Sequence, residues 1–290
     1  MTVATTTVTH ARGHARLGRD VGRGLVIVLL CAGALLMAFP YYWMVVASFK
    51  TTAELFRLPP MLVPSGLYLD NFVGIFREYP FGRWFFNSCL VACFRVPLVL
   101  LTCALGGFAF AKYEFRGRGI LFAILLGSMM IPFHILLIPL YIIITRLQLK
   151  DTYITLILPA LASGFGVFLM KQFMMSLPDE VLDAARIDGS SEFGLFYRIA
   201  LPLSRPGLAT LGLLSFLGSW NDFVWPLIVL NDKAMYTLPV GLAAMKGFNI
   251  WQTPWGYTMA AAFLASAPIL VVFSLMQRQL VSGLYLGAVR

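Results

Sequence analysis

The sequence predicts an all-α, polytopic membrane protein with six transmembrane helices, and three observations support that prediction. Hydrophobic residues make up 59% of the chain and charged residues only 12%, about half the share that is usual in soluble domains. Apolar residues continue for roughly twenty positions at a time, the length that a helix needs to cross the hydrocarbon core. These runs are continuous rather than alternating, which favours helices over the strands of a barrel.

Six apolar segments are long enough to cross a membrane, and polar segments separate them. The fourth is the shortest. Prolines lie inside several of these segments or near their ends, so we expect bent or broken helices. Such breaks are tolerated in a membrane where neighbouring helices form hydrogen bonds with the freed backbone groups. The predicted spans are Gly24–Ser48, Phe85–Ala111, Gly119–Thr145, Tyr153–Met170, Gly207–Leu230 and Tyr257–Met276.

The basic residues predict the orientation of the spans. Arg12, Arg16, Arg19 and Arg23 precede the first apolar run, which is too long for a signal peptide and has no small-residue cleavage site after it. We interpret the run as an uncleaved span whose tail is cytoplasmic, so that six spans place both termini in the cytoplasm. Thirteen basic residues then lie inside and eight outside, as the positive-inside rule favours. In a chain this apolar, the net charge of +9 does not indicate nucleic-acid binding.

These boundaries divide the chain into four predicted parts. Two are tails and two contain the spans. The parts are a cytoplasmic basic tail at 1–23, a first transmembrane helix with an extracytoplasmic loop at 24–84, a transmembrane core at 85–276 that includes a cytoplasmic hairpin at 176–202, and a cytoplasmic C-terminal tail at 277–290.

The polar segment 178–202, between the fourth and fifth spans, is the best guide to function. Ser176 can cap a helix whose first turn holds acids, where the helix dipole favours them. Gly189 suits the turn that follows, because glycine enters the left-handed region at little cost. A second helix begins near the serine pair 190–191 and ends at Pro202. The segment holds five of the thirteen acids of the chain: Asp179, Glu180, Asp183, Asp188 and Glu192.

The second helix of this hairpin is expected to be amphipathic. Its apolar positions Phe193, Phe196, Tyr197 and Ala200 form one stripe. The pattern alone leaves two interpretations open. The hairpin is either a dock for a water-soluble partner or a surface hairpin that packs only on its own transmembrane helices.

From Asp183 to Pro202 the hairpin reads Asp-Ala-Ala, three residues, Gly, nine residues, Ile, one residue and Leu-Pro. This spacing resembles the EAA motif of binding-protein-dependent ABC importer permeases. That motif consists of Glu-Ala-Ala, three residues, Gly, nine residues, Ile, one residue and Leu-Pro. An aspartate replaces the glutamate here, which keeps the charge and shortens the side chain. The matching positions are Asp183, Ala184, Ala185, Gly189, Ile199, Leu201 and Pro202.

The resemblance implies the type I ABC importer permease fold, with 85–276 as its transmembrane core. It also implies that the hairpin is a coupling helix that docks into a cleft of a cytoplasmic ATPase. The docking core would be Asp183, Ala184, Ala185 and Gly189. The full set expected to couple to the ATPase is Glu180, Asp183, Ala184, Ala185, Gly189, Ile199, Leu201 and Pro202.

Other segments resemble the carbohydrate branch of this family, specifically the smaller permease of the maltose-type importer. The resemblance implies a bacterial-type plasma (inner) membrane and four kinds of partner: a second permease subunit, two ATPase subunits, an extracytoplasmic sugar-binding protein and membrane lipid. The chain ends at Arg290 instead of the usual Gly-Ala-Val-Lys-Gly, which leaves the family's contact between this tail and the ATPase open. The segments are PYYWMVVASFK (40–50), YLDNF (68–72), IPLY (138–141), SWNDFVWPL (219–227) and QRQLVSGLYLGAVR (277–290).

The chain lacks the motifs of an ATPase and of an intramembrane enzyme. It contains no Gly-Lys dipeptide and therefore no GxxxxGK[ST] phosphate loop, and neither HExxH nor GxSxG occurs in it. We expect no catalytic, cofactor or metal site in this chain, and we expect partner ATPase subunits to bind ATP and Mg²⁺. A di- or oligosaccharide is the expected cargo. The alternatives are glycerol-3-phosphate in the same type of importer and an ion-coupled secondary transporter, which usually shows internal repeats and midplane charges.

Three polar residues inside the predicted spans are candidates for the translocation pathway or its gate. Arg95 either faces a cavity or an ion partner, or lies near enough to a helix end to reach an interface. Asn221 and Asp222 follow Trp220 in the fifth span. They either contact substrate or form hydrogen bonds between helices.

Overall fold

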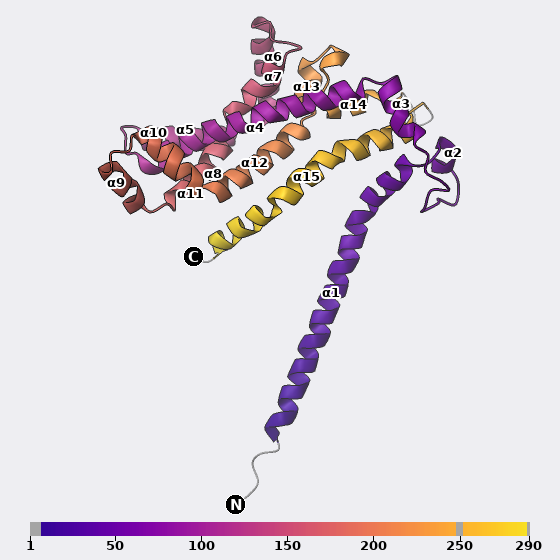
Figure 1. Cartoon of the computed structure of the whole chain (residues 1–290), viewed down its shortest axis with the longest axis horizontal. Coiled ribbons are helices and arrows are strands. Elements are labelled where there is room, and N and C mark those ends of the chain that lie inside the picture. The colour runs from indigo at the N-terminus through magenta and orange to yellow at the C-terminus, as the bar shows by residue number, and fades with distance from the viewer. Residues whose placement is uncertain (1–6, 248–251, 289–290) are drawn as a thin grey trace, which may run out of the picture.

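The computed structural model describes residues 7–247 and 252–288, with side chains over 23–247 and 252–277. Every regular element in these residues is a helix (Figure 1), which confirms the all-α prediction. Three helices contain segments long and apolar enough to cross a membrane without a break. They are α1 (Thr7–Ser48), α4 (Phe81–Lys112) and α15 (Trp255–Ala288).

Three further candidate spans are helix pairs that bend sharply at a short break, with angles of 98°, 47° and 79° in chain order. With each pair counted as one span, the described part of the chain contains up to six candidate spans, the predicted number, but the third pair begins at Glu192, inside the segment predicted to be a cytoplasmic hairpin. The first pair is α5 (Arg118–Met129) with α6 (Phe133–Arg146). The second is α7 (Tyr153–Ile157) and the 3-10 turn η1 (Leu158–Leu161) with α8 (Gly164–Met175). The third is α10 (Glu192–Leu195), the π-helical turn η2 (Phe196–Ala200) and α11 (Leu201–Leu203) with α12 (Arg205–Trp220).

The fifth and the last predicted spans also differ from the observed helices in their ends. The segment Gly207–Leu230 is not one helix, because α12 ends at Trp220 and the short α13 (Val224–Val229) follows after a break. Pro226 lacks the backbone N–H that a continuous helix would need at that position. The last helix is longer than predicted, because residues 277–288 contain no proline and extend α15 to Ala288.

α4 lies at the centre of the bundle and packs most extensively against α8 and α12. Gly107 lets α4 approach α8 closely: a Cβ at this position would lie 2.6 Å from Cβ of Met170 and 2.8 Å from the backbone nitrogen of Lys171. Cys103 and Met174 are completely buried in the same interface. The two helices therefore leave no space for a side chain at Gly107.

The segment that follows α13 is fixed to the N-terminal half of α4. The indole of Trp84 donates a hydrogen bond to the carbonyl of Lys233 at 2.9 Å. The side-chain amide of Asn87 donates to the carbonyls of Ala234 and Tyr236 at 2.8 and 2.9 Å. The helices of this segment are η3 (Lys233–Met235) and α14 (Leu238–Ala244).

α1 diverges from the bundle, and only its C-terminal end lies against α15 (Figure 1). Leu35 and Met37 are 73% and 85% exposed, whereas Ala47 and Ser48 at the end of the helix are buried. The side chains of α1 from Arg23 to Tyr42 are exposed within this chain. The short α2 (Thr52–Leu55) and α3 (Asp70–Glu78) follow α1 and contact α15.

We expect Gly107→Ala to lower the midpoint of thermal unfolding of the purified protein in detergent. The added Cβ forces α4 and α8 apart, at a cost of about 1–3 kcal/mol. Gly127→Ala in α5 is the matched control, because no atom lies within 4 Å of a Cβ at Gly127 and alanine is the better helix former by about 1 kcal/mol. Equal stability of the two variants would contradict the packing described for α4.

Candidate functional site

The polar hairpin consists of α9 (Asp179–Ile187), a glycine turn and the helix that begins with α10. Gly189 has a φ of +84°, and its N–H donates to the carbonyl of Arg186 at 3.0 Å. Ser191 caps the second helix, because its hydroxyl accepts a hydrogen bond from the backbone N–H of Gly194 at 3.2 Å. The predicted turn and the predicted start of the second helix are therefore confirmed.

The prediction that Ser176 caps the first helix of the hairpin is wrong. Ser176 ends α8 instead, and its hydroxyl donates to the carbonyl of Phe173 at 2.7 Å. Pro178 occupies the cap position of α9 in an extended conformation, with a φ of −61° and a ψ of 129°; its ring restricts φ, and it needs no partner for a backbone N–H. Pro202 does not end the second helix, which continues to Leu203.

The predicted apolar stripe of the second helix is only half correct. Phe196 and Ala200 are buried, as expected, together with Leu195. Phe193 and Tyr197 are 75% and 70% exposed. The π-helical turn at 196–200 changes the spacing that a regular helix would have, and these two aromatic side chains lie outside the packed face.

Lys112, the last residue of α4, fixes the start of α9. Its ammonium group donates to the carbonyl of Leu177 and to the carboxylate of Asp179, both at 2.6 Å. The Lys112 side chain is only 5% exposed. The hydrogen bond and the positive charge of Lys112 lower the pKa of Asp179.

A second group of charged residues joins the two helices of the hairpin to the end of α4. Arg186 pairs with Asp183 at 2.7 Å and with Glu192 at 3.1 Å. The hydroxyl of Tyr113 donates to the carboxylate of Glu192. Burial and this hydrogen bond raise the pKa of Tyr113 to about 12, so the hydroxyl stays protonated and keeps donating at neutral pH.

The outer face of the hairpin is exposed. A hollow of about 550 Å³ lies at the elbow, lined by Gly189, Phe193 and Tyr197 among others. The predicted coupling residues do not all lie on this face. Exposed are Glu180, Asp183, Ala184, Gly189 and Pro202, whereas Ala185, Ile199 and Leu201 are half-buried and pack against the core shared with α4 and α8.

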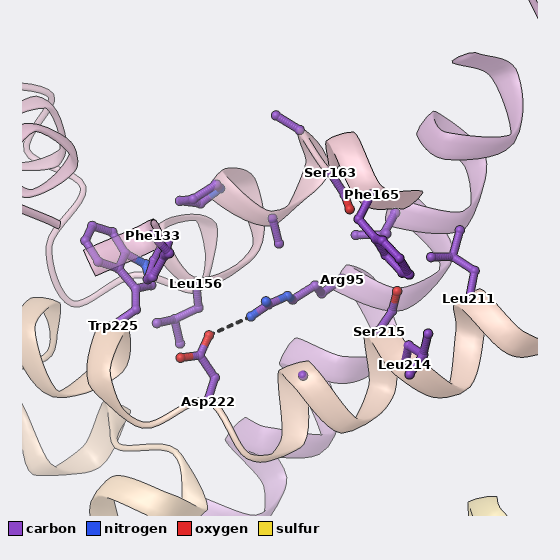
Figure 2. Close-up of a pocket in the computed structure, with 15 residues that line it drawn as sticks. Arg95, Phe133, Leu156, Ser163, Phe165, Leu211, Leu214, Ser215, Asp222 and Trp225 are labelled. Carbon is purple, nitrogen blue, oxygen red and sulfur yellow. Dashed lines mark hydrogen bonds and ion pairs between the residues drawn. The ribbon is translucent and has the colours of Figure 1, made fainter. Parts of the chain in front are cut away.

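A second polar site lies in a cavity of about 330 Å³ between α4, α12 and the turn that precedes α8. Figure 2 shows Arg95 of α4 directed at Asp222, and the two side chains form an ion pair at 2.8 Å. Each is about one fifth exposed, at 18% and 21%. Because α4 begins at Phe81, Arg95 lies well inside the helix, which favours the first interpretation of this arginine: a cavity and an ion partner.

Two buried indoles hold Asp222 at this position. The ring nitrogen of Trp220 donates to the carbonyl of Ala265 at 3.0 Å, and that of Trp225 donates to the carbonyl of Thr155 at 2.9 Å. Residues 221–223 between these anchors are not helical, so the carboxylate can turn toward α4. Asn221 is exposed and its amide donates to the carbonyl of Leu217, so it does not join the pair.

We expect Lys112→Met to speed hydrogen–deuterium exchange in the backbone of 177–183 by about tenfold. This factor corresponds to about 1.4 kcal/mol, the scale of one hydrogen bond to a charged group. Arg116→Met is the matched control, because Arg116 is exposed in the same loop. Unchanged exchange in Lys112→Met would contradict the anchoring role.

Comparisons with known proteins agree with this architecture. A family model described as "Binding-protein-dependent transport system inner membrane component" matches residues 103–284. The arabinooligosaccharides transport system permease protein AraQ of Halalkalibacterium halodurans is 41% identical over 89% of this chain and 92% of its own length. The sn-glycerol-3-phosphate transport system permease protein UgpE of Agrobacterium fabrum is 36% identical over 92% of this chain and 97% of its own length.

A solved structure shares the fold. It is that of a bacterial ABC transporter involved in the import of the acidic polysaccharide alginate, with a TM-score of 0.76 over 96% of this chain and 99% of that chain, at 20% identity. A second structure contains the bacterial alginate ABC transporter in complex with a periplasmic protein bound to an alginate pentasaccharide, with a TM-score of 0.63. The resemblance to importer permeases drawn from the hairpin motif is confirmed. The chain belongs to the family of binding-protein-dependent transport system inner membrane components.

Proposed function

We propose that this chain is one of two permease subunits of an importer for a di- or oligosaccharide. Two separate ATPase subunits bind ATP and Mg²⁺ and power transport, and an extracytoplasmic binding protein delivers the sugar. The observation that carries the proposal is the hairpin, whose small-residue face is exposed while its other face is fixed to α4. The arabinooligosaccharide permease at 41% identity supports the sugar class.

The exposed face of the hairpin has the features of a docking surface. Ala184 and Gly189 are exposed, and their small size lets another protein approach the backbone closely. Phe193 and Tyr197 supply exposed aromatic area, and aromatic residues are enriched at interface cores. In the proposed coupling set, the exposed residues contact the ATPase. The half-buried Ala185, Ile199 and Leu201 pack against the core and stabilise the conformation of the hairpin.

The proposed orientation places the hairpin and the loop 112–118 in the cytoplasm. The hairpin docks the ATPase from that side, and both termini lie there too. The segment at 231–247 then lies outside, where its attachment to α4 presents it to the binding protein. The excess of basic residues on the cytoplasmic side supports this orientation.

The exposed length of α1 supports a second permease subunit. The part of α1 from Arg23 to Tyr42 is exposed within this chain (Figure 1). In the membrane, one side of α1 contacts lipid. Because α1 diverges from the bundle, a second permease subunit can pack against its other side. Arg95 and Asp222 line a cavity beside α12, and we assign them to the translocation pathway.

A glycerol-3-phosphate importer of the same type is the second candidate. The glycerol-3-phosphate permease of Agrobacterium fabrum supports it, because it is 36% identical over 92% of this chain. The two candidates share the fold and the coupling mechanism. They differ in the charge of the cargo.

We expect Ala184→Trp to weaken ATPase binding at least tenfold, or by about 1.4 kcal/mol, because the indole blocks close approach to α9. The chain is expressed with the neighbouring transporter genes, and the ATPase that co-purifies with the complex is quantified. Transport and sugar-stimulated ATP hydrolysis are measured on the same preparations with loaded binding protein.

Arg116→Trp serves as the control, because it adds the same indole to an exposed position in the neighbouring loop. Normal ATPase binding and transport in Ala184→Trp would refute the proposed docking face. A transport-active complex that contains no ATPase would refute the importer function itself.

A further inference from the structure

The cavity around Arg95 and Asp222 has a chemistry that distinguishes between the two candidate cargoes. We propose that this cavity binds part of an uncharged, hydroxyl-rich cargo, and that Asp222 acts as a specificity-determining residue by neutralising Arg95. The inference rests on the proposed function, because it assumes that the cavity belongs to the translocation pathway. The inference places a sugar contact in this subunit and predicts that the cavity does not bind a phosphate ester.

The charges of the cavity cancel. Of the described residues that line it, Arg95 and Asp222 are the two with charged side chains. A guanidinium group alone in such a cavity would be a good phosphate ligand, because its planar fork matches two phosphate oxygens. Here the carboxylate of Asp222 lies 2.8 Å from the guanidinium and would repel a phosphate that approached it.

The ion pair leaves hydrogen-bonding capacity for a neutral ligand. Among the residues that the structure describes, Arg95 has one hydrogen-bond partner, the Oδ2 atom of Asp222, and a guanidinium group has five N–H donors. Sugar hydroxyls both donate and accept, so they can bind the arginine and the carboxylate together. The half-buried Ser215 adds a hydroxyl to the same wall.

Aromatic rings lie on both sides of the ion pair. Figure 2 shows Phe133 and Trp225 near its Asp222 end and Phe165 near the other end of the Arg95 side chain. Phe133 and Phe165 are each 45% exposed, so their faces can pack against the C–H face of a sugar ring. A few polar groups between aromatic walls are typical of small-molecule sites. The volume of about 330 Å³ suits a part of an oligosaccharide rather than the whole.

The test is ligand binding to the complete importer in lipid nanodiscs, measured by saturation-transfer NMR, which detects weak binding. The neutral probes are arabinotriose and maltotriose, and the anionic probe is sn-glycerol-3-phosphate. In the wild-type complex we expect the neutral probes to give at least a fivefold stronger signal than the anionic probe. Asp222→Asn should raise the sn-glycerol-3-phosphate signal at least fivefold, and inorganic phosphate should compete with it.

Two further variants assign the effect to the cavity. The double variant Arg95→Gln/Asp222→Asn should lose the gain in sn-glycerol-3-phosphate binding, because the cation is gone. Phe165→Leu should weaken the neutral probes at least threefold and leave the anionic probe unchanged. If the complex with Asp222→Asn does not assemble, two measurements remain. Binding of the neutral probes to Phe165→Leu tests whether the cavity contacts sugar, and the comparison of neutral and anionic probes in the wild type tests whether the cavity disfavours an anionic cargo.

Three results would overturn the inference. They are equal binding of the neutral and anionic probes to the wild type, no gain of anionic binding in an assembled Asp222→Asn complex, and unchanged sugar binding in Phe165→Leu. Co-purified ATPase and transport are recorded on the same samples. A complex that transports sugar but fails these binding tests refutes only this inference, whereas a complex without the ATPase refutes the proposed function.

Discussion

The attachment of α4 to its neighbours is the constraint on which the rest of the structure depends. A membrane helix satisfies its backbone polar groups internally, so its side chains make the connections to other elements. Gly107 brings α4 against α8. Lys112 joins its end to the hairpin, Arg95 joins its middle to Asp222, and Asn87 joins its beginning to the segment after α13. A displacement of the hairpin therefore acts on a helix that also bounds the cavity and holds the segment after α13.

The pairing of the few charged groups of this chain is compatible with both the proposed ATPase contact and the proposed pathway for a neutral cargo. In the hairpin, Arg186 pairs with Asp183 and Glu192, so these charges are largely satisfied within the hairpin, while Glu180, Ala184, Gly189, Phe193 and Tyr197 stay exposed. In the cavity, Arg95 and Asp222 satisfy each other, which lowers the cost of placing either charge in the membrane. The same pairing principle stabilises both sites, with different consequences for what each site can bind.

Local chemistry made part of this architecture predictable. The turn at Gly189 could be predicted because a backbone position with positive φ favours glycine. The helices could be predicted from the continuous apolar runs. The partnership of Arg95 with Asp222 was not predictable, because 127 residues separate them and only tertiary packing brings them together. The exposure of Tyr197 was also missed, because a π-helical turn interrupts the regular spacing of the helix.

We infer from the contacts of Lys112 that the hairpin and α4 move as one body when the proposed ATPase partner binds nucleotide. The direct measurement is double electron–electron resonance (DEER) between pairs of spin labels on the complete importer. The labels are placed at Ile187 of α9, Phe94 of α4 and Leu36 of α1, which are all exposed. The native cysteines are first removed. With a non-hydrolysable ATP analogue, the distance from Ile187 to Phe94 should stay constant while the distance from Phe94 to Leu36 changes. A changed distance from Ile187 to Phe94, with α4 stationary relative to α1, would contradict the account.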